Sequence, residues 1–159
     1  METCKKMKIA YVAETSLNNN SAYSQHVIKM CDALSKKNNL KLILPELKNY
    51  SGFNFIKKKF LLTSKKKFNI EAVIDSKVSN VFLRIFFSLR TSIKLKNERP
   101  DLILTRSILT SFFLSFFKTY HYLEIHNDLK GLTRFLMIKL NYINSNYVYK
   151  IIFISNSLK

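Results

Sequence analysis

Short apolar runs alternate along the chain with longer segments in which apolar residues recur every three or four positions. Runs that are apolar throughout are typical of strands buried on both faces of a parallel sheet, and the longer spacing is typical of helices. The predicted strands are residues 7–13, 40–44, 70–74, 101–105, 120–125 and 149–154. The predicted helices are residues 22–37, 78–95, 107–117 and 132–144.

Residues that start or stop helices support these boundaries. Asn20 or Ser21 is a suitable N-cap for the first helix, and Ser107 is one for the third. Pro45 closes the second strand, and Pro100 ends the helix before the fourth strand. The second helix carries an apolar stripe at three- and four-residue steps, which we expect to face the core rather than a lipid surface. This stripe consists of Val81, Phe82, Ile85, Phe86, Leu89 and Ile93.

The alternation of strand and helix predicts the fold class. It favours an α/β fold with an open, doubly wound parallel sheet of the Rossmann-like type and helices on both faces. A length of 159 residues suits one domain, so the expected domain covers residues 1–159. Ligands of such sheets bind at the carboxyl ends of the strands. Four polar groups follow predicted strands and are expected to share this edge: residues 14–21, 106–107, 126–128 and 155–157.

The charge balance indicates an anionic partner. The net charge is +17, from 27 Lys and Arg against 10 Asp and Glu. Lys outnumbers Arg by 22 to 5. Because Arg is the residue preferred for bidentate hydrogen bonds to bases, we expect no nucleic acid to be recognised by its sequence. A lysine-rich composition also follows from AT-rich codons, which leaves a compositional origin of the charge open.

Two lysine triplets flank the apolar residues Phe60, Leu61 and Leu62. Basic clusters beside apolar residues bind anionic membrane surfaces, whereas a solvated lysine-rich surface is an equal alternative. The lysines of this predicted membrane-facing surface are Lys57, Lys58, Lys59, Lys65, Lys66 and Lys67.

Several classes of protein are excluded by what the sequence lacks. Two cysteines, Cys4 and Cys31, and three scattered histidines do not build a metal site, so no metal is expected. No hydrolase, metalloprotease, Walker or dinucleotide motif is present. The longest apolar stretch, residues 108–117, is half the length of a spanning helix, and no secretory leader is visible. We therefore expect a cytoplasmic protein. A peripheral position on the inner face of the membrane is an additional expectation.

Four segments in order resemble landmarks of the family 4 glycosyltransferases. They are MKIAYVAE with SAYSQHVIKMCDALSKKNNLKLILP, then RPDLILTRS, YHYLEIHNDL and YKIIFISNSLK. The resemblance implies the amino-terminal, acceptor-side domain of a GT-B enzyme, whose second domain holds the nucleotide-sugar. That donor-binding domain is absent from this sequence, so a fragment inactive alone, or a split enzyme with a partner chain, is implied. A truncated or degraded gene product is an alternative that equally explains a sequence with this domain alone.

The implied activity is transfer of a sugar from a nucleotide-sugar to a hydroxyl of a glycan or lipid-linked acceptor, with retention of the anomeric configuration. The nucleotide-sugar is a co-substrate, and no other cofactor is implied. The resemblance assigns His126 to the cleft beside the transferred sugar, where an imidazole can donate a hydrogen bond or exchange a proton near neutral pH. The alternative for His126 is a structural hydrogen bond in a loop.

The other candidate residues are substrate-binding groups. The Arg106 guanidinium suits a phosphate or carboxylate, and the alternative is a structural ion pair. Asn20 and Ser21 begin a helix, where the dipole favours an anion, although plain capping also explains them. Asn127 and Asp128 can accept hydrogen bonds from acceptor hydroxyls or start a turn. Ser155 follows the last predicted strand and completes the set.

Three further polar residues have structural interpretations. Glu124 lies within a predicted strand and is expected to be an edge or partner-paired carboxylate. His26 lies on the first helix and is expected to pack or to be solvated. His121 alternates within a strand, and no role is predicted for it.

Overall fold

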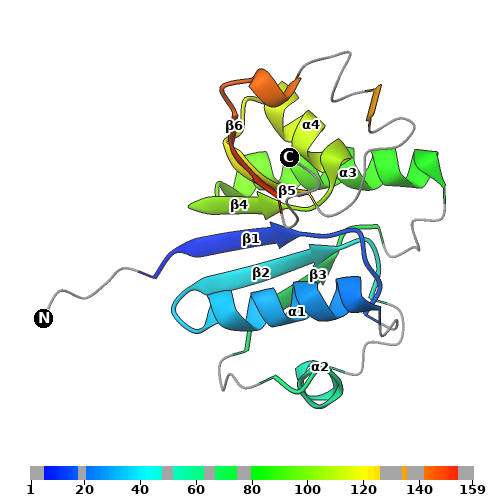
Figure 1. Cartoon of the computed structure of the whole chain (residues 1–159), viewed down its shortest axis with the longest axis vertical. Coiled ribbons are helices and arrows are strands. Elements are labelled where there is room, and N and C mark those ends of the chain that lie inside the picture. The colour runs from blue at the N-terminus through cyan, green and yellow to red at the C-terminus, as the bar shows by residue number, and fades with distance from the viewer. Residues whose placement is uncertain are drawn as a thin grey trace, which may run out of the picture. The chain divides into compact units, whose positions relative to one another are not determined.

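The structure is a computed structural model of the chain, shown in Figure 1. It describes residues 6–17, 21–47, 52–62, 67–74, 80–125, 134–135 and 142–153. The strands are β1 (Lys8–Val12), β2 (Asn39–Leu44), β3 (Asn69–Ala72), β4 (Leu102–Thr105), β5 (His121–Ile125) and β6 (Val148–Phe153). The helices are α1 (Ala22–Ser35), α2 (Phe53–Lys59), α3 (Val81–Glu98) and α4 (Ile108–Phe116), with a short 3-10 turn, η1, at Tyr142–Asn144.

The strands form a six-stranded sheet in the order β3-β2-β1-β4-β5-β6, and their pairings are parallel. Helices follow strands along the chain and flank the sheet. This is the α/β, Rossmann-like architecture predicted from the apolar pattern, and that prediction is confirmed. All six predicted strands are present, with ends that differ by at most two residues from the prediction.

The chain divides into two compact units. The first unit comprises Met1–Lys77 with Pro100–Leu102, and the second comprises Val78–Arg99 with Ile103–Lys159. The expectation of a single domain over residues 1–159 stays a prediction, because this division does not test whether the units fold separately.

The core of the first unit is built from buried side chains of β1, β2 and α1. Tyr11, Leu42 and Ile43 of the strands are fully buried, and so are Val27 and Ile28 of the helix. Figure 1 shows α1 lying along one side of β2 and β3. Full burial of each Val, Ile or Leu side chain is worth about 1.5–3 kcal/mol, so this contact holds α1 on the strands.

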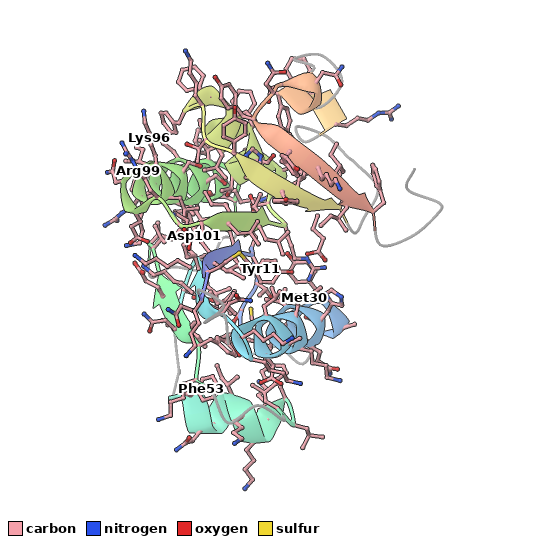
Figure 2. The ribbon with its side chains drawn as sticks, turned by 90° about the vertical axis from the view of Figure 1, so that its left-hand side faces the viewer. Tyr11, Met30, Phe53, Lys96, Arg99 and Asp101 are labelled. Atoms are coloured by element: carbon pink, nitrogen blue, oxygen red, sulfur yellow. The ribbon has the colours of Figure 1, made fainter. Side chains whose placement is uncertain are left out.

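The short helix α2 is attached to the first unit by a few specific contacts. Ile56 is buried, and the ring of Phe53 meets Phe68 edge to face with centroids 5.1 Å apart. Lys59 donates a hydrogen bond of 2.9 Å from Nζ to the carbonyl oxygen of Leu17, in the loop after β1. Figure 2 shows Phe53 on this helix.

The second unit has a core on β5, α4 and η1. The cluster consists of buried Leu109, Leu123, Ile125 and Tyr142, with half-buried side chains packed around it. The last strand, β6, has no fully buried side chain, and its Tyr149, Ile152 and Phe153 are exposed. The strand β6 therefore contributes backbone hydrogen bonds to the sheet more than it contributes buried side chains to the core.

The prediction that the apolar stripe of the helix over residues 78–95, now α3, faces the core is wrong. The helix forms as expected, but Val81, Phe82, Phe86 and Ile93 are exposed rather than buried, with exposed fractions of 50, 83, 52 and 44%. Only Ile85 of the predicted stripe packs against the core cluster of the second unit, and it is half-buried.

The reason lies on the opposite side of α3. There Ser88, Thr91, Ser92 and Leu95 are fully buried together with Phe87. Ser92 donates hydrogen bonds from Oγ to the carbonyl oxygen of Ser88, at 2.8 Å, and to that of Thr110 in α4, at 3.2 Å. Small hydroxyl side chains allow the two helices to approach closely, and this packing takes precedence over burial of the larger apolar stripe.

The helix predicted over residues 132–144 is largely outside the described residues. Of its described residues, 134–135 are helical as predicted, whereas Tyr142–Asn144 form a 3-10 turn. Tyr142 is buried there and donates a hydrogen bond of 3.3 Å to the carbonyl oxygen of Ile108. Tertiary contacts of this one ring set the local conformation.

Candidate functional site

Two charged side chains lie at the carboxyl ends of β4 and β5. The parallel register places Thr105 opposite Leu123, so the next residues along the two strands, Arg106 and Glu124, are neighbours. Arg106 Nε lies 3.8 Å from Glu124 Oε1, and the two side chains are only 1 and 3% exposed. The prediction of a partner-paired carboxylate at Glu124 is confirmed.

This ion pair decides what Arg106 can do in the structure as it stands. In a buried ion pair, each charge offsets the desolvation cost of the other, because either charge alone would be strongly disfavoured away from water. The alternative of a structural ion pair therefore describes the observed state of Arg106. A contact between its guanidinium and a phosphate or carboxylate of a substrate stays a prediction, and it would require rearrangement around Glu124.

A tight hydroxyl-lined turn connects β4 to α4 around Arg106. The Thr105 hydroxyl accepts a hydrogen bond of 3.1 Å from the backbone N–H of Ser107. Ser107 Oγ accepts a hydrogen bond of 3.1 Å from the backbone N–H of Thr110, which makes Ser107 the N-cap of α4 as predicted. Ser88 Oγ of α3 lies 3.4 Å from Ser107 Oγ. These bonds fix the backbone that carries Arg106.

Ser21 is the N-cap of α1, as predicted. Its Oγ accepts a hydrogen bond of 3.1 Å from the backbone N–H of Ser24 and lies 2.9 Å from Ser24 Oγ. Ser24 in turn donates a hydrogen bond of 3.0 Å to the carbonyl oxygen of Ser21. The Ser21 residue is exposed, so the capping role leaves the anion-binding prediction at this helix start compatible with the structure but untested by it.

Most of the other predicted site residues lie outside the described residues. These are Asn20, His126, Asn127, Asp128 and Ser155, together with Lys65 and Lys66. Of the residues that are described, Ser21 belongs to the first unit and Arg106 to the second.

The predicted membrane-facing lysines differ in their surroundings. Lys59 is engaged with the Leu17 carbonyl, and its Nζ lies 5.7 and 5.5 Å from the ring centroids of Phe55 and Phe60. Lys58 and Lys67 are exposed, and Lys57 is half-buried. A shallow hollow on this part of the surface is lined by Asn54, Lys57, Lys58, Leu61 and Leu62.

A buried polar network in the second unit was not predicted from the sequence. His121 Nδ1 lies 2.9 Å from the carbonyl oxygen of Thr119, and its Nε2 lies 2.7 Å from Ser111 Oγ. Because the carbonyl can only accept, Nδ1 carries the proton, and the Ser111 hydroxyl donates to Nε2. Burial lowers the pKa of His121, against a smaller opposite effect of the bond to Thr119.

The phenol of Tyr142 belongs to the same network. Burial raises the pKa of Tyr142, and the nearby Ser111 hydroxyl opposes that rise. A serine hydroxyl that donates to a neutral imidazole is also the arrangement of an activated nucleophile. Here Ser111 and His121 are both fully buried, so a substrate has no access and the pair is structural.

The sequence does contain a signal for this network. Ser107, Ser111 and Ser115 recur every four residues, and Ser88 and Ser92 do the same on the preceding helix. Hydroxyl residues at this spacing share one helix face. Nothing in the spacing alone identifies His121 as their partner, because that contact depends on the position of β5.

The described part of the chain holds no group of three or more His, Cys, Asp or Glu side chains that could bind a metal ion. Among the described helices, none combines the length and apolar character needed to cross a membrane. Comparison of the sequence with protein-family models and with curated proteins gives no match.

Proposed function

We propose that this chain is the acceptor-side domain of a glycosyltransferase that resembles family 4 of these enzymes. In the reaction, the bond between the sugar and the nucleoside diphosphate breaks. A new bond forms between the anomeric carbon and an acceptor hydroxyl, whose proton is released. The acceptor is a glycan or a lipid-linked sugar, and the anomeric configuration is retained. The nucleotide-sugar is the co-substrate, and a donor-binding domain of the GT-B architecture holds it.

One observation carries this proposal: a parallel sheet in the order β3-β2-β1-β4-β5-β6 with polar residues after its strands. Sheets of this kind bind ligands at the carboxyl ends of their strands. Ser21 follows the loop after β1, and Arg106 directly follows β4. The residues after β5 and β6, including His126 and Ser155, continue the same pattern in the sequence.

The roles in the proposed reaction follow from the side-chain chemistry. His126 donates a hydrogen bond to the transferred sugar or the departing phosphate, or exchanges a proton with it. Asn127, Asp128 and Ser155 bind acceptor hydroxyls. The first turn of α1, with Asn20 and Ser21, favours a negatively charged group. Arg106 contributes positive charge when its pairing with Glu124 is relaxed.

The test is a transfer assay with radiolabelled nucleotide-sugars and mixed acceptors. Residues 1–159 without a donor-binding domain are expected to give no turnover, and addition of such a domain is expected to restore transfer. The variant His126→Ala is expected to lose that restored activity while His26→Ala keeps it. Turnover by residues 1–159 alone would contradict the need for a donor-binding domain, and equal activity of the two variants would contradict the role of His126.

A second candidate function is a non-catalytic module that binds an anionic membrane or a nucleic acid. It is favoured by the surface around α2, where exposed Lys58 and Lys67 neighbour exposed Phe55 and Leu61. Vesicle flotation and DNA retention at two salt concentrations separate the two candidates. Steeply salt-dependent binding to DNA, with no binding to anionic vesicles or sugars, would favour the nucleic-acid module over the glycosyltransferase.

The proposed location is the cytoplasm, with a peripheral fraction on the inner face of the membrane. Fractionation of cells that express the tagged chain is expected to release that fraction with high salt. Release only by detergent would contradict electrostatic attachment.

A further inference from the structure

Helix α3 exposes several of its large apolar side chains, although it buries Phe87 and Leu95, and it buries small polar ones. Phe82 is 83% exposed, Phe86 52% and Ile93 44%, and we call these three residues the outer stripe. On the opposite side Ser88, Thr91 and Ser92 are fully buried. A helix that served only the core of this unit would show the reverse arrangement.

Helix geometry places the outer stripe on one narrow face. Successive residues turn by about 100°, so Phe82, Phe86 and Ile93 lie within about 40° of one another. The buried residues Thr91 and Leu95 lie on roughly the opposite side of the helix. The outer stripe therefore runs along most of α3, over the face that packs least against the second unit.

Cationic side chains border the outer stripe on both sides. Arg90 and Lys96 are exposed and lie about 60° from the centre of the stripe, one on each side. Figure 2 shows Lys96 and Arg99 extending outward from the C-terminal end of α3. The only acid on the helix is Glu98, whose carboxylate is 2.9 Å from Lys94 Nζ. The exposed face is thus apolar at its centre and positive at its margins.

The packing between α3 and α4 has a form known from helices in lipid. Small and hydroxyl residues meet at the interface, with Ser92 hydrogen-bonded to Thr110 and Ser88 close to Ser107. In bilayers, such residues form the helix contacts while large apolar side chains face the acyl chains. Here too, hydroxyl side chains lie between α3 and α4, while Phe82, Phe86 and Ile93 lie outside; Phe87 and Leu95 are buried.

We propose that α3 docks the chain onto the surface of an anionic lipid bilayer. The helix lies in the plane of the interface, with the outer stripe inserted between the acyl chains and Arg90 and Lys96 at the level of the phosphates. A helix with an apolar face and basic margins binds in this way. Long basic side chains keep their charges at the headgroups while their methylene stems follow the apolar surface.

Charge complementarity favours a bilayer over a second copy of the chain as the occupant. A symmetric pair of α3 helices would bring the positive margins of both copies together, and each copy carries a net charge of +17. An anionic surface gains from the same charges, by about 1 kcal/mol for each Lys or Arg near it. The inference does not depend on the proposed sugar transfer, because docking needs neither donor nor acceptor.

The test is flotation of the full-length chain with vesicles of phosphatidylcholine, with and without phosphatidylglycerol. The wild-type chain is expected to float with the anionic vesicles only. The variant F82S/F86S is expected to bind them at least about tenfold more weakly, since it removes two inserted rings. The matched control M7S/Y149S changes two exposed apolar residues outside α3 and outside the α2 surface, and is expected to bind within about twofold of wild type.

A charge variant and a folding check complete the design. Arg90→Glu is expected to weaken binding at low salt and to have little effect where salt already screens the charge. Far-UV circular dichroism and urea midpoints of all variants are expected to match wild type, because the changed side chains are exposed.

Three results would overturn the proposal. The first is a wild-type chain that does not bind anionic vesicles. The second is undiminished binding by folded F82S/F86S, including the case in which M7S/Y149S loses binding instead. The third is a wild-type dimer that F82S/F86S converts to a monomer, because a second copy would then cover the stripe. The vesicles contain no nucleotide-sugar, so none of these results bears on sugar transfer.

Discussion

At the scale of the residue, the second unit depends on polar side chains that are buried in pairs. The imidazole of His121 is held between Ser111 and the Thr119 carbonyl, and Arg106 is held by Glu124. The sequence allowed prediction of a paired Glu124, because a carboxylate within an apolar strand needs a counter-charge. It did not allow prediction of which cation, since that depends on the register between β4 and β5.

We predict that His121 makes the stability of the chain depend on pH. Its folded-state pKa is lowered by burial from the ordinary value of 6.5, so the unfolded chain takes up a proton first as the pH falls. The free energy of unfolding is therefore expected to decrease as the pH drops below 6.5 towards the folded-state pKa. Urea titrations of wild type and His121→Gln from neutral to mildly acidic pH measure this.

The variant His121→Gln should flatten that pH dependence, because it removes the buried imidazole. An identical loss of stability on acidification in wild type and His121→Gln would show that His121 is not responsible.

Breaking the buried ion pair is expected to be costly, and replacing both partners much less so. Glu124→Gln and Arg106→Met each leave a charge without its counter-charge, at about 3–5 kcal/mol of unfolding free energy. The double variant E124Q/R106M should lose clearly less than the sum of the two single losses. Denaturant unfolding of the four proteins measures the coupling, and additive losses would mean that the two charges do not stabilise each other.

At the scale of the element, capping and apolar runs were the most informative signals. Ser21 and Ser107 were predicted as N-caps, and both accept the expected backbone hydrogen bond. The wrong side of α3 was predicted because apolar spacing identifies a helix but does not reveal which face meets a neighbour. Here the serine spacing on α3 and α4 was the better guide to the interface, since small residues permit close packing.

We predict that the two caps contribute unequally to stability. Ser107→Ala removes a cap inside the second unit, where Ser107 is buried and close to Ser88, and is expected to cost about 1–2 kcal/mol. Ser21→Ala removes an exposed cap, whose N–H groups can turn to water, and is expected to cost about 0.5–1 kcal/mol. Thermal and urea unfolding of both variants gives the comparison, and a larger loss for Ser21→Ala would contradict it.

At the scale of the whole molecule, the sheet was predictable and the site was predictable only in part. Apolar runs such as Leu40–Leu44 are buried on both faces in a parallel sheet, so they stand out in the sequence. Residues after strands, such as Arg106, were identified from the same logic. The environment of these residues could not be predicted, because burial of Arg106 against Glu124 depends on tertiary contacts that no local pattern encodes.

The unequal burial of the strands also governs how the protein opens. Side chains on β1 and β2 are almost all buried, whereas β6 buries none fully. Amide protons in β6 should therefore exchange with deuterium through local fraying, and those in β1 and β2 only through much larger openings. Exchange followed by mass spectrometry on the intact chain would show this gradient as early labelling of β6, and uniform labelling of all strands would mean that the sheet opens as one cooperative body.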